Sequence, residues 1–324
     1  MPEKKKVVIY ATGGTIAGVG HKGKTVGYHS GVITAEQLIK DIPQINDVVD
    51  VETVQFCNVN SDDMSGEEWI RLARTINERA KDENTAGFVI THGTDTLEET
   101  AYFLNLTVKT DKPVVLTGSM RPSTAISADG PLNLYQAVIA AASKETFGKG
   151  VLAVFSDHIY AARSVTKTNT YHVMAISAGE MGAAGIIRDD MVYMYEVPDK
   201  KHTLQTEFDV SGLSGLPKVS ILYFAVDADP ALLSYAASCS DGLVIAGAGA
   251  GEYSLAYKAV IEKLKIPVVI SSRIYDGVIT QNGLLSENTV AANNLPPQKA
   301  AVLLRLALTK TKNTDEIKRM FSVY

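Results

Sequence analysis

The sequence predicts an α/β protein with two α/β domains: a larger N-terminal domain with a mostly parallel sheet covered by helices, and a smaller C-terminal α/β domain. The first observation is that short, almost wholly apolar runs alternate with longer segments of helical periodicity, as in parallel sheets covered on both faces. The second is a polar stretch broken by Gly and Pro at residues 196–217, after which the alternation resumes. This stretch predicts a linker between domains 1–195 and 218–324, and about two domains fit a chain of 324 residues.

In the N-terminal domain, local signals predict each element in turn. Two capping boxes, Thr34–Gln37 and Ser65–Glu68, mark helix starts, because the hydroxyl caps the first turn and the Gln or Glu caps it in return. The expected helices are 35–40, 66–76, 96–104 and 132–142. The expected strands are 6–10, 87–90, 113–116 and 151–155, with short strands within 173–195.

The C-terminal domain repeats the alternation on a smaller scale. Its expected strands are 219–224, 243–245 and 268–270, and its expected helices are 231–237, 254–264 and 298–309. Ligands of open α/β sheets bind beyond the carboxyl ends of the strands. The turns that follow strands are therefore the places to look for functional groups: 11–18, 91–95, 117–124 and 246–252.

Composition and charge exclude several classes of protein. A net charge of −5 argues against nucleic acid as a partner, because phosphate binding needs a basic face. No apolar stretch reaches the about 20 residues of a membrane-spanning helix, and the start has no signal-peptide pattern. The expected compartment is the cytoplasm for the chain as it stands, and the periplasm if a signal has been removed. The six histidines and two distant cysteines show no metal-ligand spacing, so no metal site is expected.

Two glycine-rich segments partly match nucleotide-binding motifs. Residues 18–25 fit the phosphate-loop pattern, but the preceding strand ends near Tyr10 and the following residues are poor helix formers. Residues 247–252 follow a strand but have Glu252 where the dinucleotide fingerprint requires Gly or Ala. We expect a Gly-rich loop at the first segment and a tight turn at the second, and nucleoside triphosphate hydrolysis is a remote alternative.

Two other segments combine glycine with hydroxyl side chains at the ends of buried strands, residues 11–18 and 91–100. Glycine lets backbone N–H groups approach a ligand, as an oxyanion hole requires. Thr15 and Thr94 are candidate nucleophiles if a base takes their proton, and a lysine desolvated in a pocket, such as Lys167, can be that base. The residues alone leave a second interpretation open, in which these are capping and turn residues.

The chain resembles the bacterial-type L-asparaginase family, and within it the type II branch, over nearly its whole length. The segments that carry the resemblance are ATGGTIAG (11–18), THGTDTLEET (91–100), GSMRPSTAISADGP (118–131), VTKTNT (165–170), SSR (271–273) and PQKAAVLLRLALT (297–309). The resemblance implies hydrolysis of the side-chain amide of L-asparagine to L-aspartate and ammonia, without a cofactor. It also implies a homotetramer with its sites at the interface of intimate dimers.

The resemblance further implies roles for catalytic residues. Thr15 matches the family's nucleophilic threonine, on a loop that closes over the substrate, and Tyr28 matches the tyrosine that helps to activate it. Thr94, Asp95 and Lys167 match a second, rigid catalytic group in which Lys167 is the base. Whether the reaction passes through an acyl-enzyme on the first threonine or through direct attack by water stays open.

Substrate-binding residues follow from the same matches. Ser61 and Asp95 match positions that hold the α-carboxylate and the α-amine, and the carbonyl of Ser119 matches one that accepts from the side-chain amide. Gly14 belongs to the turn that brings backbone N–H groups to the ligand. Asp62 stands where many family members have Gln, and a second carboxylate there can also hold an ammonium.

Two further departures concern contacts from a neighbouring subunit. Ala250 replaces a usual Asn, and Leu284 stands where a Glu usually approaches the substrate amine. We expect the longer glutamine to be held less well, and therefore a higher selectivity for asparagine. The alternatives are a broad-specificity glutaminase-asparaginase and a catalytically inactive relative that binds amino acids.

Overall fold

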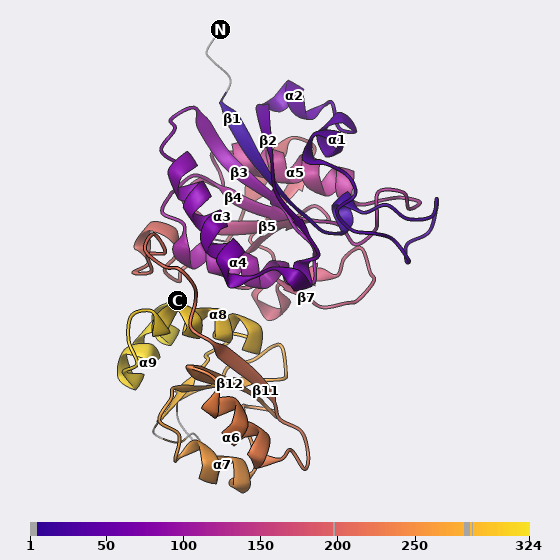
Figure 1. Cartoon of the computed structure of the whole chain (residues 1–324). Helices are drawn as coiled ribbons and strands as arrows, with labels where there is room; N and C mark the ends of the chain where they lie inside the picture. The colour runs from indigo at the N-terminus through magenta and orange to yellow at the C-terminus, as the bar shows by residue number, and fades with distance from the viewer. Residues whose placement is uncertain (1–4, 197, 282–285, 287) are drawn as a thin grey trace. The chain divides into compact units, whose positions relative to one another are not determined.

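The computed structural model describes residues 5–196, 198–281, 286 and 288–324. The chain divides into two compact units, Met1–Ser211 and Gly212–Tyr324, and each has its own sheet (Figure 1). Both units combine strands with covering helices, so the predicted α/β class with a larger N-terminal and a smaller C-terminal part is confirmed.

The first unit is built on an eight-stranded sheet with the order β10-β9-β6-β5-β4-β3-β1-β2. The strands are β1 (Lys6–Gly13), β2 (Asp50–Val59), β3 (Thr85–Thr91), β4 (Val114–Thr117), β5 (Val151–Phe155), β6 (His158–Ala161), β9 (Gly185–Arg188) and β10 (Met191–Met194). Strands β2, β1, β3, β4 and β5 pair in parallel, whereas β6, β9 and β10 pair antiparallel. The strand order reverses between β1 and β3, which is where open α/β sheets bind ligands.

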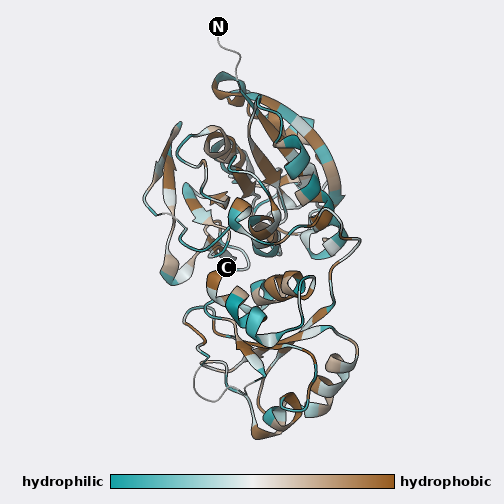
Figure 2. Cartoon of the chain, turned by 90° about the vertical axis from the view of Figure 1, so that its left-hand side faces the viewer, coloured by the Kyte–Doolittle hydropathy of each residue, from teal (hydrophilic) through white to brown (hydrophobic). Residues whose placement is uncertain are grey.

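Helices cover both faces of this sheet (Figure 1). They are α1 (Ala35–Lys40), α2 (Ile45–Val48), α3 (Gly66–Arg79), α4 (Leu97–Thr107) and α5 (Gly130–Ala142). Both predicted capping boxes are present, at the starts of α1 and α3. One apolar core joins α1, α2 and α5 to the face of β1 that carries Val7 and Ile9. On α3, Trp69 stacks on Phe103 of α4. Figure 2 shows apolar residues on the inner strands and on parts of the helices.

The second unit has a four-stranded parallel sheet with the order β11-β12-β13-β14. Its strands are β11 (Val219–Tyr223), β12 (Gly242–Gly247), β13 (Val268–Ser272) and β14 (Thr289–Ala291). Its helices are α6 (Pro230–Ser238), α7 (Leu255–Ile261), α8 (Pro297–Leu308) and α9 (Thr314–Val323). Leu233 of α6 and Tyr257 of α7 pack with Ile245 and Ile270 of the sheet to form its core.

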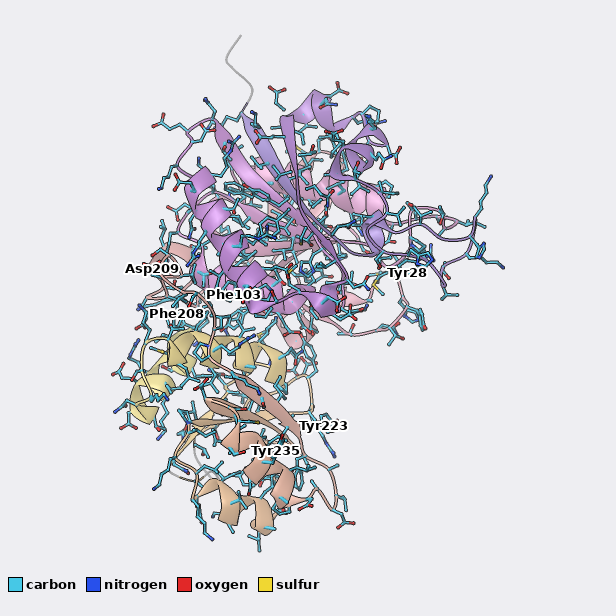
Figure 3. The ribbon with its side chains drawn as sticks, viewed as in Figure 1. Tyr28, Phe103, Phe208, Asp209, Tyr223 and Tyr235 are labelled. Atoms are coloured by element: carbon cyan, nitrogen blue, oxygen red, sulfur yellow. The ribbon has the colours of Figure 1, made fainter. Side chains whose placement is uncertain are left out.

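The part of the polar stretch from Thr203 to Val210 packs on the rest of the first unit. Phe208 and Val210 are buried, and Lys109 Nζ donates hydrogen bonds to the carbonyls of Thr203 and Thr206. Among the residues labelled in Figure 3, Phe208 and Phe103 of α4 are buried, whereas Tyr223 and Tyr235 of the second unit are exposed. Contacts between residues about 100 positions apart therefore tie down a segment that composition describes as polar and broken.

Lys167 lies on a short strand, β7 (Thr166–Lys167), which pairs with β8 (Ile176–Ser177). The antiparallel strand β6 lies between β5, which ends at Phe155, and β7. Over the described ranges, no helix combines the length and the apolar character needed to cross a membrane.

Candidate active site

The candidate site lies at the carboxyl ends of β1 and β3, beside the reversal in strand order. Thr15 begins the short 3-10 helix η1 (Thr15–Ala17) after β1, and Thr94 and Asp95 follow β3. Because neighbouring parallel strands end at the same edge of a sheet, the two threonine segments converge although they are about 80 residues apart in the chain.

Close backbone approach between loops brings a third segment into the site. Gly14 has φ +79°, and a Cβ there would lie 2.4 Å from the backbone nitrogen of Gly93. A Cβ on Gly93 would in turn lie 2.7 Å from Oγ of Ser61. Only glycine allows such contacts, so the turns after β1, β3 and β2 pack directly on one another.

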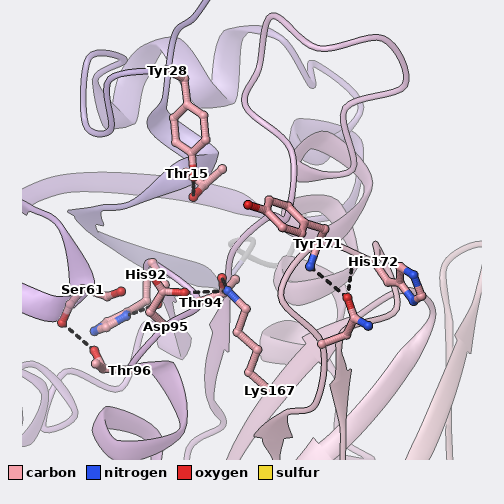
Figure 4. Close-up of polar contacts among 12 residues, drawn as sticks. Thr15, Tyr28, Ser61, His92, Thr94, Asp95, Thr96, Lys167, Tyr171 and His172 are labelled. Carbon is pink, nitrogen blue, oxygen red and sulfur yellow. Dashed lines mark hydrogen bonds and ion pairs between the residues drawn. The ribbon is translucent and has the colours of Figure 1, made fainter. Parts of the chain in front are cut away.

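Thr15 and Tyr28 form the first group of the site. Their hydroxyl oxygens are 2.7 Å apart, and Thr15 is buried (Figure 4). Tyr28 comes from the loop of residues 18–31, whose two sides are joined by backbone hydrogen bonds between Val19 and His29. The segment 18–25 runs into this loop and not into a helix, so the expected Gly-rich loop is confirmed.

Thr94, Asp95 and Lys167 form the second group. Lys167 Nζ donates to Oγ1 of Thr94 at 2.9 Å and to Oδ1 of Asp95 at 2.6 Å (Figure 4). The Lys167 side chain is 17% exposed and that of Asp95 is 67% exposed. Asn169 Oδ1 accepts from the backbone N–H groups of two following residues and closes the loop after β7. A ligand can therefore reach Asp95 while Lys167 stays largely covered.

The remaining predicted residues of the first unit lie on the loops around these groups. Ser61 is buried at the start of the 3-10 helix η2 (Ser61–Asp63), and its carbonyl accepts a hydrogen bond from Thr96 Oγ1 at 2.5 Å. Asp62 is exposed on the same turn. Ser119 follows β4 and is fully buried, with its hydroxyl donating to the Arg121 carbonyl at 2.7 Å.

Ala250, one of the two further departures from the family pattern, belongs to the second unit. Ala250 is exposed in a turn of the second unit, where Ala248 and Glu252 pair and a Cβ on Gly247 would lie 2.4 Å from Gly251. The predicted tight turn is therefore confirmed. Leu284 lies outside the described residues.

A buried histidine lies directly before Gly93 and Thr94. Trp69 Nε1 donates to Thr100 Oγ1 at 2.8 Å, the Thr100 hydroxyl contacts His92 Nε2 at 3.0 Å, and His92 Nδ1 contacts the Gly93 carbonyl at 2.7 Å. Because the Gly93 carbonyl can only accept, His92 Nδ1 carries the proton, and Nε2 of the neutral ring accepts from the Thr100 hydroxyl. Burial lowers the pKa of His92 to about 4, so the ring is neutral at pH 7. Sequence periodicity does not predict this chain of hydrogen bonds from Trp69 through Thr100 and His92 to Gly93.

This depressed pKa predicts how stability depends on pH. Between pH 6.5 and about 4 the unfolded chain binds a proton at His92 that the folded chain does not, so stability falls as the pH falls. The contribution is fully present above pH 6.5 and amounts to about 3 kcal/mol over that window. Urea unfolding at several pH values should show a shallower decline for His92→Asn, which keeps a donor to Gly93.

His172→Asn, at an exposed loop position, is the matched control and should decline as the wild type does. Burial also lowers the pKa of His202, but that residue is common to all three proteins. Equal pH slopes for the wild type and His92→Asn would contradict the prediction.

The described part of the chain contains no group of three or more His, Cys, Asp or Glu side chains arranged to hold a metal ion. The polar groups at the site are one hydroxyl–phenol pair, one hydroxyl–amine pair and one carboxylate. Such a set suits nucleophilic attack on a carbonyl with internal proton transfer.

Comparison with known proteins agrees with this geometry. Residues 6–200 match the family model "Asparaginase, N-terminal" and residues 218–321 match "Glutaminase/Asparaginase C-terminal domain". The chain is 44% identical to L-asparaginase 2 of Escherichia coli (strain K12), over 98% of this chain and 93% of that protein. It is 42% identical to the glutaminase-asparaginase of Acinetobacter glutaminasificans, over 99% of this chain and 100% of that protein.

A solved structure extends the likeness to three dimensions. The crystal structure of a probable cytoplasmic L-asparaginase from Campylobacter jejuni has a TM-score of 0.95 and 45% identity, covering 99% of this chain and 100% of that chain. Full-length coverage at this identity, together with matches to both domains, shows that this chain belongs to the asparaginase family.

Proposed function

We propose that this protein hydrolyses the side-chain amide of L-asparagine to L-aspartate and ammonia. The observation that carries the proposal is the pairing of Thr15 with Tyr28 beside the Thr94–Asp95–Lys167 group at one sheet edge, in a member of the asparaginase family. The names of the relatives support the substrate.

The zwitterionic end of asparagine supplies the handle for binding. In our proposal the α-ammonium binds the open side of the Asp95 carboxylate, with Asp62 on the neighbouring turn as a second acceptor. The α-carboxylate accepts from Ser61, and the side-chain amide donates to the carbonyl of Ser119. Backbone N–H groups of the turn at Gly14 stabilise the negative charge that develops on the amide oxygen.

Thr15 is the proposed nucleophile. Its Oγ1 forms a bond to the amide carbon, and the C–N bond breaks. Thr15 loses its hydroxyl proton and the departing nitrogen gains one proton, so ammonia leaves. Water then attacks the resulting ester, one proton returns to Thr15, and the hydroxide becomes part of the product carboxyl group. Tyr28, 2.7 Å from Thr15, orients the attacking oxygen.

Lys167 is the proposed base of the second group. In the free enzyme its ammonium is held by Asp95. The substrate ammonium competes for the same carboxylate. As the proposed base, Lys167 takes a proton through Thr94, whose hydroxyl it already contacts.

We further propose a homotetramer in the cytoplasm, with sites at the interface of intimate dimers. The family resemblance supports the assembly, and two free cysteines, Cys57 and Cys239, fit a reducing compartment. The second candidate function is a broad-specificity glutaminase-asparaginase, which the 42% identity to the Acinetobacter protein favours.

The test is ammonia release from L-asparagine and from L-glutamine at equal concentrations, followed to kcat/KM for each. We expect rapid release from asparagine and at least ~10-fold lower kcat/KM for glutamine, because each lost contact to the longer substrate costs about 1 kcal/mol or more. Comparable values for both substrates would favour the broad-specificity enzyme. Release from neither, with binding of asparagine retained, would indicate an inactive amino-acid-binding relative.

A further inference from the structure

Two loops of the first unit meet above the candidate site. We call residues 18–31 the lid, because this loop carries Tyr28, and residues 123–126 the latch. The lid follows η1, and the latch lies between β4 and α5. The two segments are about 100 residues apart in the chain, and no periodic pattern links them.

The latch forms hydrogen bonds to the backbone of the lid. The Gly18 carbonyl accepts from both the backbone nitrogen and Oγ of Ser123, at 3.1 and 2.8 Å. The Gly20 N–H donates to Oγ1 of Thr124 at 3.0 Å, and the Gly23 N–H donates to the Thr124 carbonyl at 2.8 Å. Four hydrogen bonds therefore fix the first part of the lid to the latch.

Tyr28 rests on the backbone that the latch holds. A Cβ on Gly18 would lie 2.9 Å from Cδ2 of the Tyr28 ring, and one on Gly20 would lie 2.8 Å from the Tyr28 Cβ. The tyrosine is thus packed against the glycines that Ser123 and Thr124 pin. A shift of Gly18 or Gly20 moves the ring and, with it, the hydroxyl that contacts Thr15.

The latch itself is held in place from the other side. The Asp129 carboxylate accepts from the backbone N–H groups of Met120 and Arg121, each at 2.9 Å, and the Arg121 guanidinium donates to the Ser127 carbonyl. The segment from Met120 to Asp129 is consequently held by hydrogen bonds that do not involve the lid.

We propose that Thr124, assisted by Ser123, is a positioning residue that keeps the lid closed and so sets the contact between Tyr28 and Thr15. The inference rests on the proposed function only in its kinetic consequence, since the hydrogen bonds to the lid are independent of the substrate. Loss of the Thr124 acceptor leaves the Gly20 N–H without its partner in the closed lid and shifts the lid toward open states.

The kinetic test compares Thr124→Val, which keeps the shape but removes the acceptor, with Thr124→Ser, which keeps it. We expect kcat/KM for asparagine to fall about fivefold in Thr124→Val, mainly through KM, and to stay near the wild-type value in Thr124→Ser. Thr75→Val is the matched control, because Thr75 is also partly buried and its hydroxyl donates to the Arg71 carbonyl in the same helix, α3.

A second readout measures the lid directly. Lys22 and Lys24 are exposed in the lid, so the rate of tryptic cleavage after them, followed by mass spectrometry, reports its opening. We expect about fivefold faster cleavage in Thr124→Val and no change in Thr124→Ser or Thr75→Val. The midpoint of thermal unfolding of Thr124→Val should stay within about 2 °C of the wild type.

The outcomes separate the two proposals. Faster lid cleavage in Thr124→Val supports the latch even if the wild type releases no ammonia from asparagine, a result that would sink only the proposed function. Unchanged cleavage and unchanged kcat/KM would overturn the latch. The latch would also be overturned if Thr124→Val had a lowered unfolding midpoint and lost activity that Thr124→Ser does not restore. A general structural defect would then explain the effect.

Discussion

Replacing Thr15 with alanine is expected to lower kcat for asparagine at least ~10²-fold, which corresponds to about 2.7 kcal/mol of lost transition-state stabilisation. The variant removes the oxygen that we propose to attack the amide carbon, and it leaves the Tyr28 hydroxyl without the partner it contacts at 2.7 Å. Steady-state ammonia release with purified wild type and variant, measured side by side, is the direct check.

Thr15→Ser is the control for this prediction. It keeps a hydroxyl at the same backbone position, so it should retain far more activity than Thr15→Ala, whereas both variants should unfold at nearly the wild-type temperature. Full activity in Thr15→Ala would show that another group attacks the amide, and Thr94, buried next to Lys167, would become the candidate nucleophile.

Lys167→Met is expected to reduce kcat by a similar factor, at least ~10²-fold. Methionine fills much of the same volume but cannot accept a proton from Thr94, and it removes the ion pair to Asp95. Asp95 then keeps its negative charge for the substrate ammonium, so we expect KM to change much less than kcat. The kcat and KM of the variant, determined separately, test both statements.

Lys167→Arg distinguishes a base from a mere counter-ion. Arginine keeps the positive charge beside Asp95 but does not release a proton at neutral pH. We therefore expect Lys167→Arg to be nearly as impaired as Lys167→Met. Recovery of wild-type kcat in Lys167→Arg would mean that Lys167 serves through its charge alone, and the proton transfer through Thr94 would have to be abandoned.

The elements that sequence reasoning identified correctly are those with strong local signals. The capping boxes at Thr34 and Ser65 predicted the starts of α1 and α3 because the hydrogen bonds of a capping box involve only residues three apart. Central strands such as β3 and β5 were identified because both their faces are buried, which produces nearly continuous apolar runs.

Strand β2 shows where such signals end. It spans ten residues at the edge of the sheet, and its side chains are partly buried or exposed along its whole length, so no apolar run marks it. Its polar residues become a strand because β1 offers a parallel partner from Lys6 onwards. The same reason applies to β6 and β7, which are short and take their conformation from the strands beside them.

For the candidate site, the sequence by itself determined which residue types are available: glycines and threonines after β1 and β3, a carboxylate next to Thr94, and a lysine in a polar segment. Only the tertiary structure decided which of them touch. Lys167 contacts Thr94 and Asp95 across more than 70 residues, and the latch contacts the lid across more than 100. Propensities, caps and periodicities act between residues a few positions apart, whereas these contacts depend on strand order, which is set by the burial of the whole sheet.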